Sequence, residues 1–454
     1  MRVKMTVAAM ALAMLALVVP ASAAADGSRV VRVDPGESIQ AAIDKARPGT
    51  TIKLGEGTYK ESVTIARSDI AIEGQGRSKT KIEVPAAGDL PAGEGCVDES
   101  GGHKSVSGIC VAPEAQGQCE NSPRVTGPDA PPVVRAIDDV QVSKLAVTGF
   151  NGIGVLFFCA DDPEVTRVLA RGAEEGAEYG IAAFASEDVA FTRNLTVDGG
   201  EAGIYIGDSP HADANVWKNV SWKSGFGIFI RDAAHGTLQK NKTFGNCVGI
   251  LFLNTDESQA PPEFQGPPID VKDWLAKQNG VTANNRPCPA GDEGEATSGI
   301  GIAVVSGIDV RLIDNGVFGN DSPAESVVKG GIVVIGEPGF KPSTETKVGF
   351  NTAHGNTTDI VWDGQGSGNA FFRNDCLTSD PDGLCEDPDE NGDGEHGDDH
   401  DRGDGHHKGD RHDRGEHKRK HVKHKKHKSH KKHRSHKKNK SHKKNKSHKR
   451  DRDD

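Results

Sequence analysis

Gly-Ile-Tyr-Ile-Gly-Asp at residues 203–208 and Gly-Ile-Phe-Ile-Arg-Asp at residues 227–232 follow one pattern, and this pattern decides the fold. Each segment begins with glycine, alternates apolar residues with others, and ends in aspartate. Runs of four to six residues with a period of two, bounded by turn residues, predict strands rather than helices. The spacing of 24 residues between the two segments indicates a repeat.

The same glycine-apolar start occurs at Gly154, Gly180 and Gly249, with spacings of 22 to 26 residues, and further apart at Gly301 and Gly331. A repeat this short cannot bury its apolar face alone, whereas stacked repeats bury a continuous core and pair their strands in parallel. Asparagine also recurs, and stacked asparagines suit a ladder of turns. This second series consists of Arg167, Asn194, Asn219, Asn241, Asn279, Asn315, Asn351 and Asn374. The sequence therefore predicts an all-β fold, a parallel β-helix.

A helix is expected over Ser38–Ala46, where isoleucine and alanine recur at helical spacing after a serine that can cap the first turn. Short strands are expected after it, at residues 51–54, 62–65 and 70–73. The terminal edge of a stacked sheet must be covered, because an open edge pairs with other chains. We therefore expect this helix to cap the first coil.

The segments Ser-Ile-Gln-Ala-Ala-Ile (38–43), Arg-Pro-Gly-Thr-Thr-Ile (47–52), Gly-Thr-Tyr (57–59) and Ile-Glu-Gly-Gln-Gly (72–76) carry a family resemblance. Together they resemble the opening of right-handed parallel β-helix proteins of the pectate-lyase-like superfamily. The later coils resemble the repeats of nitrous-oxide-reductase accessory proteins and of polysaccharide-processing enzymes. The resemblance covers roughly residues 30–376 and implies the fold. It implies no single function, because that superfamily includes lyases, hydrolases, epimerases, adhesins and binding proteins.

Charge is distributed unevenly along the 454 residues. Residues 386–454 contain 23 Lys and Arg against 16 Asp and Glu, whereas the rest of the chain contains 32 against 50. An acidic body and a basic tail therefore underlie the formal net charge of −11. The tail holds 14 of the 18 histidines, ends in near-hexads of Ser, His and Lys, and has no carboxylate side chain from Lys418 to Arg450. Such a segment is predicted to be disordered and to bind polyanions.

The N-terminus has the features of a secretory signal peptide. Arg2 and Lys4 precede an apolar run at 7–19, and Ala-Ser-Ala at 21–23 is a cleavage sequence. The apolar run is short for a membrane span and no later segment qualifies, so the mature chain is expected to have none. The alternative is an uncleaved membrane anchor. The expected location is secreted or cell surface. The expected parts are a signal peptide (1–23), a β-helix domain with Cys-bearing loop insertions (24–385), an acidic linker (386–417) and a disordered basic tail (418–454).

Export makes the eight cysteines informative, because disulfides form in an oxidising compartment. Cys376 and Cys385 bracket a short loop that contains Asp, Pro and Gly, and we expect them to pair. A Gly- and Pro-rich insertion at 86–132 holds three more cysteines. The pairing of the remaining six is left open by the sequence; they are Cys96, Cys110, Cys119, Cys159, Cys247 and Cys288.

The repeat also brings polar residues together on neighbouring coils. Counted from the glycine starts, Asp208 and Asp232 take the same position, and His211 and His235 follow three residues later. With their neighbours they are predicted to form one patch on the outer surface. The candidate catalytic residues are Tyr205, Asp208, His211, Arg231, Asp232 and His235.

This set has the chemistry that a uronate polymer requires. Arginine can bind a sugar carboxylate through two hydrogen bonds, and two close carboxyl groups can differ in pKa and so act as acid and base. Residues 205–211 also resemble the Tyr, Asp-Pro-His motif of mannuronan C-5 epimerases, although Ser209 separates Asp208 from Pro210. The structural alternative is that these residues cap turns, as stacked polar residues on a β-helix commonly do.

Asp387, Asp389, Asn391 and Asp393 place oxygen ligands at alternate positions with glycine at the sixth, which is the spacing of a calcium loop. Position twelve is Asp398 rather than glutamate. Ca²⁺ is therefore the candidate cofactor, and an acidic linker without metal is the alternative. The tail histidines could bind Zn, Ni or Cu.

These features predict a secreted β-helix protein that binds an acidic extracellular polysaccharide or cell-wall polymer. As an enzyme it would be a polysaccharide lyase, hydrolase or epimerase. Two alternatives remain open: a non-catalytic cell-surface or matrix protein attached to anionic polymer by its basic tail, and a metal-handling accessory protein. Nucleic acid is expected to bind only non-specifically, through the tail.

Overall fold

The computed structural model describes residues 29–90, 95–99, 104–123, 130–173, 176–256, 268–290, 295–337 and 339–385. The expected signal peptide, acidic linker and basic tail lie outside the described residues. The candidate calcium ligands Asp387, Asp389, Asn391 and Asp393 also lie outside them. In the part of the chain that the structure describes, none of the helices has the length and apolar character needed to span a membrane.

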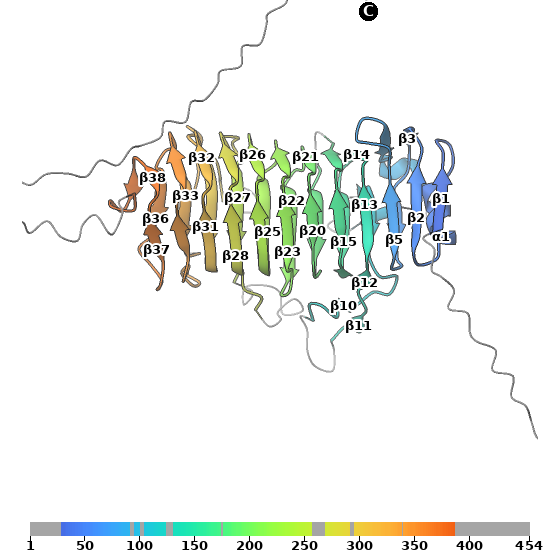
Figure 1. Cartoon of the computed structure of the whole chain (residues 1–454), viewed down its shortest axis with the longest axis horizontal. Coiled ribbons are helices and arrows are strands. Elements are labelled where there is room, and N and C mark those ends of the chain that lie inside the picture. The colour runs from blue at the N-terminus through green and yellow to red at the C-terminus, as the bar shows by residue number, and fades with distance from the viewer. Residues whose placement is uncertain are drawn as a thin grey trace, which may run out of the picture. The chain divides into compact units, whose positions relative to one another are not determined.

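This part of the chain is a right-handed parallel β-helix, as predicted, and its coils run through three sheets in turn (Figure 1). The first sheet contains β1 (Arg29–Val33), β2 (Thr50–Leu54), β5 (Ile70–Glu73), β13 (Val140–Ser143), β17 (Glu164–Thr166), β20 (Ala190–Thr192), β23 (Ala214–Trp217), β28 (Lys272–Lys277), β31 (Ile308–Ile313), β34 (Lys347–Gly349) and β37 (Ala370–Phe372). The second contains β3 (Gly57–Tyr59), β6 (Thr80–Glu83), β14 (Ala146–Phe150), β18 (Leu169–Gly172), β21 (Leu195–Val197), β24 (Val220–Trp222), β26 (Lys242–Phe244), β29 (Gly280–Thr282), β32 (Gly316–Phe318), β35 (Thr352–His354) and β38 (Asp375–Cys376).

The third sheet contains β4 (Val63–Ile65), β9 (Ile109–Val111), β15 (Ile153–Phe158), β19 (Tyr179–Phe184), β22 (Ala202–Ser209), β27 (Val248–Leu253), β30 (Ile300–Val305), β33 (Gly330–Ile335), β36 (Ile360–Trp362) and β39 (Ser379–Asp380). The long strand β25 (Phe226–Gln239) runs through the third sheet and then the first, so it joins the two. Three short pairs complete the strands: β7 (Cys96–Asp98) with β8 (Ser105–Ser107), β10 (Gln118–Cys119) with β11 (Val133–Val134), and β12 (Ile137–Asp138) with β16 (Ala160–Asp161). A 3-10 helix, η1, spans Ala87–Asp89.

The glycine-apolar starts lie in register, which confirms the predicted repeat. Ile204 of β22 pairs with Ile228 of β25, which in turn pairs with Ile250 of β27, and all three side chains are fully buried. The glycine before each isoleucine allows the coils to stack closely. A Cβ atom on Gly227 would lie 2.5 Å from the carbonyl oxygen of Gly249 in the next coil.

Gly227→Ala is expected to destabilise the protein by about 1–3 kcal/mol, because the added methyl group meets backbone that cannot move aside. Gly280→Ala is the matched control, since a Cβ there would have its nearest contact at 3.9 Å, with Lys242 Cγ. Urea unfolding measures both variants. Equal unfolding midpoints for the two would contradict this account of the glycine starts.

The helix α1 (Ile39–Lys45) confirms the predicted N-terminal cap. Ser38 Oγ accepts a hydrogen bond from the Ala41 amide at 3.1 Å, and Ile39 and Ile43 are buried against the first coil. The Glu61 carboxylate accepts from the amide of Ile39 at 2.9 Å, so it also satisfies the start of the helix. A strand that the sequence did not suggest, β1, precedes the helix and pairs with β2.

The asparagines form a buried ladder at the turn between the first and second sheets. Asn279 shows the pattern: its Oδ1 accepts the Asn241 amide at 2.9 Å, and its Nδ2 donates to the Leu238 carbonyl at 3.0 Å. Asn315 binds Asn279 in the same way, one coil further on. The ladder therefore satisfies backbone groups that each turn would otherwise leave buried and unpaired.

The placing of Arg167 in this ladder is wrong by one residue. Val168 takes the ladder position, because its amide donates to Asn194 Oδ1 at 2.9 Å. Arg167 aligns instead with Arg193, since Thr166 pairs with Thr192 in the preceding position. The sequence concealed this because the residue before each asparagine is frequently basic as well.

All eight cysteines are paired, and the expected Cys376–Cys385 disulfide is confirmed. The remaining disulfides are Cys96–Cys110, Cys119–Cys159 and Cys247–Cys288. The insertion at 86–132 is not a loop throughout, because β9 lies within it and pairs with β4 and β15 of the third sheet. The Cys96–Cys110 bridge ties the hairpin of β7 and β8 to this strand.

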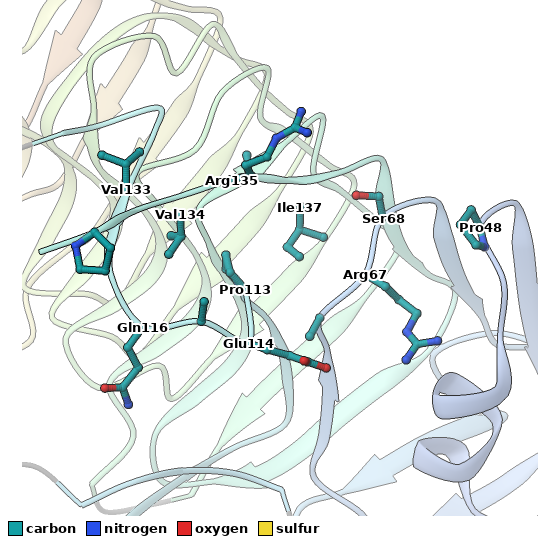
Figure 2. Close-up of a pocket in the computed structure, with 14 residues that line it drawn as sticks. Pro48, Arg67, Ser68, Pro113, Glu114, Gln116, Val133, Val134, Arg135 and Ile137 are labelled. Atoms are coloured by element: carbon teal, nitrogen blue, oxygen red, sulfur yellow. The ribbon is translucent and has the colours of Figure 1, made fainter.

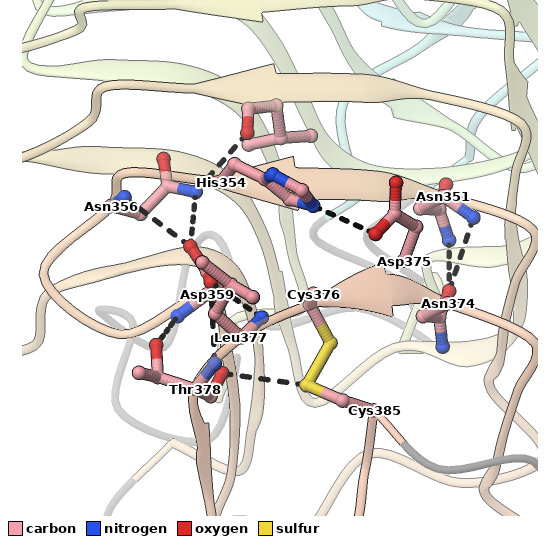
Figure 3. A network of polar contacts seen from close by, with 11 residues as sticks. Asn351, His354, Asn356, Asp359, Asn374, Asp375, Cys376, Leu377, Thr378 and Cys385 are labelled. Carbon is pink, nitrogen blue, oxygen red and sulfur yellow. Dashed lines mark hydrogen bonds and ion pairs between the residues drawn. A yellow bond between two sulfur atoms is a disulfide. The ribbon is translucent and has the colours of Figure 1, made fainter.

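The last coil is closed by polar contacts (Figure 3). Asn351 Nδ2 donates to Asn374 Oδ1 at 3.0 Å, which is the final step of the ladder. The buried carboxylate of Asp359 accepts from the amide of Leu377 at 3.0 Å, and the Cys376–Cys385 bridge lies beside it. The expected end of the coils near Cys376 agrees with this arrangement.

Candidate functional site

The outer face of the third sheet carries aromatic side chains where β19, β22 and β25 run side by side. The ring of Tyr205 lies 4.6 Å from that of Tyr179, 4.7 Å from Phe184 and 5.3 Å from Phe229. Its sequence neighbours Ile204 and Ile206 point into the coil, so Tyr205 points outward. Tyr205 is nevertheless only 2% exposed, because the surrounding rings cover it.

Gly207 makes room for the Tyr205 ring. A Cβ atom on Gly207 would lie 2.1 Å from Tyr205 Oη, so the phenol lies directly over this glycine. Gly207 pairs with Arg231 in the next coil, which brings the hydroxyl group toward the base of that arginine. In this coil, the glycine near the end of the repeated segment therefore leaves the space that the Tyr205 ring occupies.

Arg231 and Asp232 stand at the bend where β25 leaves the third sheet. Arg231 Nε lies 3.4 Å from Asp232 Oδ2, and the arginine side chain is 43% exposed while the aspartate is 1% exposed. Both oxygens of Asp232 accept hydrogen bonds from Thr255, from its amide at 2.8 Å and its hydroxyl at 2.6 Å. Asp232 is thus held firmly, and it forms an ion pair with Arg231, whose Nε is buried and makes no hydrogen bond.

Asp208 and Asp232 take equivalent positions on adjacent coils, since Gly207 pairs with Arg231 and Ser209 with Ala233. Both adopt the left-handed backbone conformation, with φ of 54° and 46°. Aspartate tolerates this conformation better than most residues, so a turn-forming role is present in both. The repeat therefore places the backbones of the two aspartates one strand spacing apart.

Tyr205, Asp208, Arg231 and Asp232 lie close enough to influence one another's pKa values. Burial, and then the Asp208 charge, raises the pKa of Tyr205, so its hydroxyl stays protonated. Burial also raises the pKa of Asp232 against the opposing effect of the Thr255 hydrogen bonds and Arg231. Desolvation would lower the pKa of Arg231, but Tyr205, Asp232 and Asp208 outweigh it and raise that pKa.

Further residues belong to this neighbourhood that the sequence did not indicate. Burial and the nearby charges of Asp256 and Asp232 raise the pKa of Glu337. Tyr179 Oη donates to Glu201 Oε2 at 2.5 Å, beside Tyr205. An outward ladder through Leu156, Ala182, Tyr205 and Phe229 could have been read from the repeat register, and it would have revealed the aromatic surface. The glutamates stand outside the repeated strands, and no sequence signal marks them.

His211 and His235 form a separate pair. Their rings are stacked, with 6.3 Å between centroids and 2° between planes. His235 Nδ1 lies 3.2 Å from Asp273 Oδ2, and the charge of His211 acts on Glu187. The structure thus brings together Tyr205, Asp208, Arg231 and Asp232. His211 and His235 stack on each other at the turn that follows, and His235 pairs with Asp273 of β28.

Acidic residues line that turn, which leads from the third sheet into the first. Asp161, Asp162 and Asp188 each place an oxygen within 4.8 Å of the others, a spacing that a metal ion could bridge. Burial and neighbouring carboxylates raise the pKa of Asp161 and of Asp188. Asp161 is partly buried, and Asp162 and Asp188 are exposed.

A surface pocket of about 640 Å³ lies elsewhere, near the N-terminal coils (Figure 2). Its lining includes Arg67, Ser68, Glu114, Gln116 and Arg135. No predicted catalytic residue is among the residues that line this pocket. The candidate site on the third sheet is therefore separate from this cavity.

No family model matches this chain, and a comparison with curated protein sequences finds no match. Among solved structures, the A-module of the mannuronan C-5 epimerase AlgE6 from Azotobacter vinelandii aligns with a TM-score of 0.47 and 15% identity, over 75% of this chain and 90% of that one. An exopolygalacturonase of family 28 from Yersinia enterocolitica aligns with a TM-score of 0.44 and 11% identity, over 78% of each chain.

The DFA-IIIase of Arthrobacter chlorophenolicus A6, without its lid, aligns with a TM-score of 0.44 and 16% identity, over 73% of this chain and 86% of that one. At these identities the similarity concerns the fold alone, and no residue role is taken from it. The long parallel sheets of this chain fit the pectate-lyase-like β-helix that the N-terminal segments resemble.

Proposed function

We propose that this protein is a secreted β-helix protein that binds an acidic extracellular polysaccharide at Arg231 and acts on it there. The observation that carries the proposal is the partly exposed side chain of Arg231, which is paired with the buried Asp232 on an outer face that carries aromatic side chains. The carboxyl groups of Asp208 and Glu337 act on the same arginine and aspartate. A uronate carboxylate can bind the guanidinium group of Arg231 through two hydrogen bonds. Of the nearby aromatic side chains, Phe184 and Phe226 are partly exposed and could contact a sugar ring. Four disulfides support an oxidising location.

In this proposal the Asp208 carboxylate takes the proton from the carbon next to the sugar carboxylate. Expulsion of the glycosidic oxygen on the neighbouring carbon, which leaves with a proton, would then complete a lyase reaction, and return of a proton to the opposite face would complete an epimerase reaction. Asp232 is engaged on both oxygens by Thr255, so its part is to position Arg231. Tyr205 remains protonated, and its ring covers Gly207, the residue that pairs with Arg231. Arg231 would neutralise the carboxylate of the sugar, which makes the adjacent carbon-bound proton easier to remove. We assign no step to His211 and His235.

Arg231→Gln is expected to weaken binding of polygalacturonate or alginate by about tenfold or more, because a hydrogen bond to a charged group is lost. Isothermal titration with the full chain measures the affinity. Arg311→Gln is the matched control, since Arg311 has a 47% exposed side chain and lies 3.9 Å from Asp309. Equal affinities for the two variants would refute the role of Arg231.

Turnover is tested separately. Unsaturated uronate absorbance detects a lyase, new reducing ends detect a hydrolase, and NMR detects an epimerase. Asp208→Asn is expected to abolish turnover while binding persists. Turnover that survives this change would refute the role of Asp208.

A second candidate function is binding without catalysis, and the engagement of Asp232 by Thr255 favours it, because a turn-capping role alone explains that residue. The protein would then be a cell-surface or matrix component, attached to anionic polymer through its basic tail. Polymer binding without turnover on any uronate substrate would support this candidate over the first.

A further inference from the structure

A column of cations occupies the turn between the first and second sheets. It consists of Arg167, Arg193, Lys218 and Lys240, here called the basic ladder, and these residues stand at one position of four consecutive coils. The register fixes this alignment, because the residues just before them pair in sequence, Thr166 with Thr192 and Trp217 with Gln239. Successive members are therefore about 4.8 Å apart along the backbone stack.

The backbone of the basic ladder is unusual for its residue types. Its four members have φ between 56° and 58°, in the left-handed region. Gly, Asn and Asp accept this region at lower cost than Arg or Lys. At the other end of the same strands the fold does use aspartate, with Asp162, Asp188 and Asp213 at φ of 51°, 49° and 38°. The turn geometry does not require cations, because the same position of the later coils is taken by Gln278, Asp314 and Phe350, each at φ of 57°.

The basic ladder also lacks counter-charges. All four members are exposed, and within the described residues no ion pair joins any of them to a carboxylate. Lys144, one coil earlier, differs because it pairs with Glu73 at 2.5 Å. Stacked cations without partners repel one another, so a bound anion would relieve that repulsion.

Arg77, from a neighbouring turn, adds a further cation beside Arg167 and Arg193. Its guanidinium group donates to the carbonyl oxygen of Arg193. A surface pocket of about 400 Å³ lies between the turn at residues 76–78 and the turn that carries the basic ladder. It is lined by Gly76, Arg77, Ser78, Lys144, Arg167 and Arg193. No carboxylate is among these lining residues, so the pocket suits an anionic group.

Trp217 orders two members of the basic ladder. The guanidinium carbon of Arg193 lies 4.6 Å from the indole centroid, and Lys218 Nζ lies 4.2 Å from it. Such cation–π contacts hold flexible side chains over a common surface, which lowers the entropy lost on binding. The ladder is thus partly organised before any ligand arrives.

We propose that the basic ladder binds a linear anionic polysaccharide, with successive acidic groups of the polymer on successive coils. An extended chain with one carboxylate or sulfate per sugar ring repeats its charge at a distance close to one strand spacing. The rest of the body has more acidic than basic residues, so an exposed column of cations is a surface that attracts a polyanion over several coils. The ladder stands at a different turn from Arg231, and the proposal does not depend on a reaction at that residue.

The test measures protection of individual lysines in the full chain. Acetylation followed by mass spectrometry reports how fast Lys218 and Lys240 react, with Lys45 of α1 as the internal control. Polygalacturonate and a sulfated glycan such as heparin are expected to slow acetylation of Lys218 and Lys240 but not of Lys45. Neutral dextran is expected to have no effect.

A charge-matched pair of triple variants tests affinity. Arg167→Gln, Arg193→Gln and Lys218→Gln together are expected to weaken polygalacturonate binding about tenfold at low salt, since each exposed pair contributes modestly. Arg29→Gln, Arg32→Gln and Lys45→Gln remove the same charge from exposed positions elsewhere and are expected to leave affinity nearly unchanged. The difference should shrink as salt is added.

Several outcomes would overturn the proposal. Equal affinities for the two triple variants, or equal protection of all three lysines, would show that binding is general charge attraction. Protection by single-stranded DNA but not by the glycans would assign the ladder to nucleic acid instead. Protection that persists in Arg231→Gln supports the ladder even if the proposed function at Arg231 fails.

Discussion

Asn279→Ala is expected to lower the free energy of unfolding by roughly 3–5 kcal/mol. The substitution removes four hydrogen bonds of a buried amide, two with Asn241, one with Leu238 and one with Asn315. The Asn241 amide and the Leu238 carbonyl would remain buried without partners, and each orphaned group costs about 1–3 kcal/mol. Alanine offers nothing that replaces them.

Urea unfolding followed by circular dichroism measures this effect, and a second probe such as tryptophan fluorescence checks that the coils unfold together. Asn215→Ala is the control, because Asn215 is an exposed residue of β23. Its effect should stay within about 0.5 kcal/mol, as for most surface substitutions. If the two variants unfolded at the same urea concentration, the ladder would be a passive feature of the turns.

Trp274→Ala is expected to cost about 3–5 kcal/mol, the usual range for removing a buried aromatic side chain. Trp274 is fully buried in β28 and packs against Phe252, with ring centroids 5.9 Å apart. Its Nε1 donates to the carbonyl oxygen of Ala233 at 2.8 Å, directly after Asp232. The indole therefore holds the bend that presents the Arg231–Asp232 pair.

Trp274→Phe separates packing from positioning, because it keeps most of the buried ring and removes only the hydrogen bond. A smaller loss of about 1–2 kcal/mol is expected from the orphaned carbonyl. Polymer binding should weaken alongside it, since Arg231 would be held less firmly. Trp362→Ala is the control, as this ring is only partly buried and lies in the last coils. A Trp274→Phe variant with native stability and native binding would contradict this account.

The sequence was informative wherever one residue had to recur in every coil. The glycine starts, the asparagine ladder and the α1 cap follow from local rules, and the structure has them in the expected register. The Cys376–Cys385 pair was accessible because its loop is short. Arg167 was misplaced by one residue because a basic residue and an asparagine are adjacent in later coils.

The candidate site could be predicted only in part. The alignment of Asp208 with Asp232 is a direct result of the repeat. The near-complete burial of Tyr205 and Asp232 was not foreseeable, because the covering groups come from other coils, such as Thr255 after β27 and the ring of Phe184. Glu337 joins the group from a loop more than 100 residues away in the chain, and no periodic pattern marks it.

The register of the third sheet bears on how such a chain can change over evolutionary time. Ile228 and Ile250 are 22 residues apart, while Ile250 and Ile302 are separated by 52, yet both pairs are direct neighbours. The longer connection leaves the stacking undisturbed, and the entropy cost of lengthening a loop grows only slowly. New peptide segments can therefore be inserted between coils without changing the packing of the core. Insertions and the stability of the coils can thus evolve almost independently.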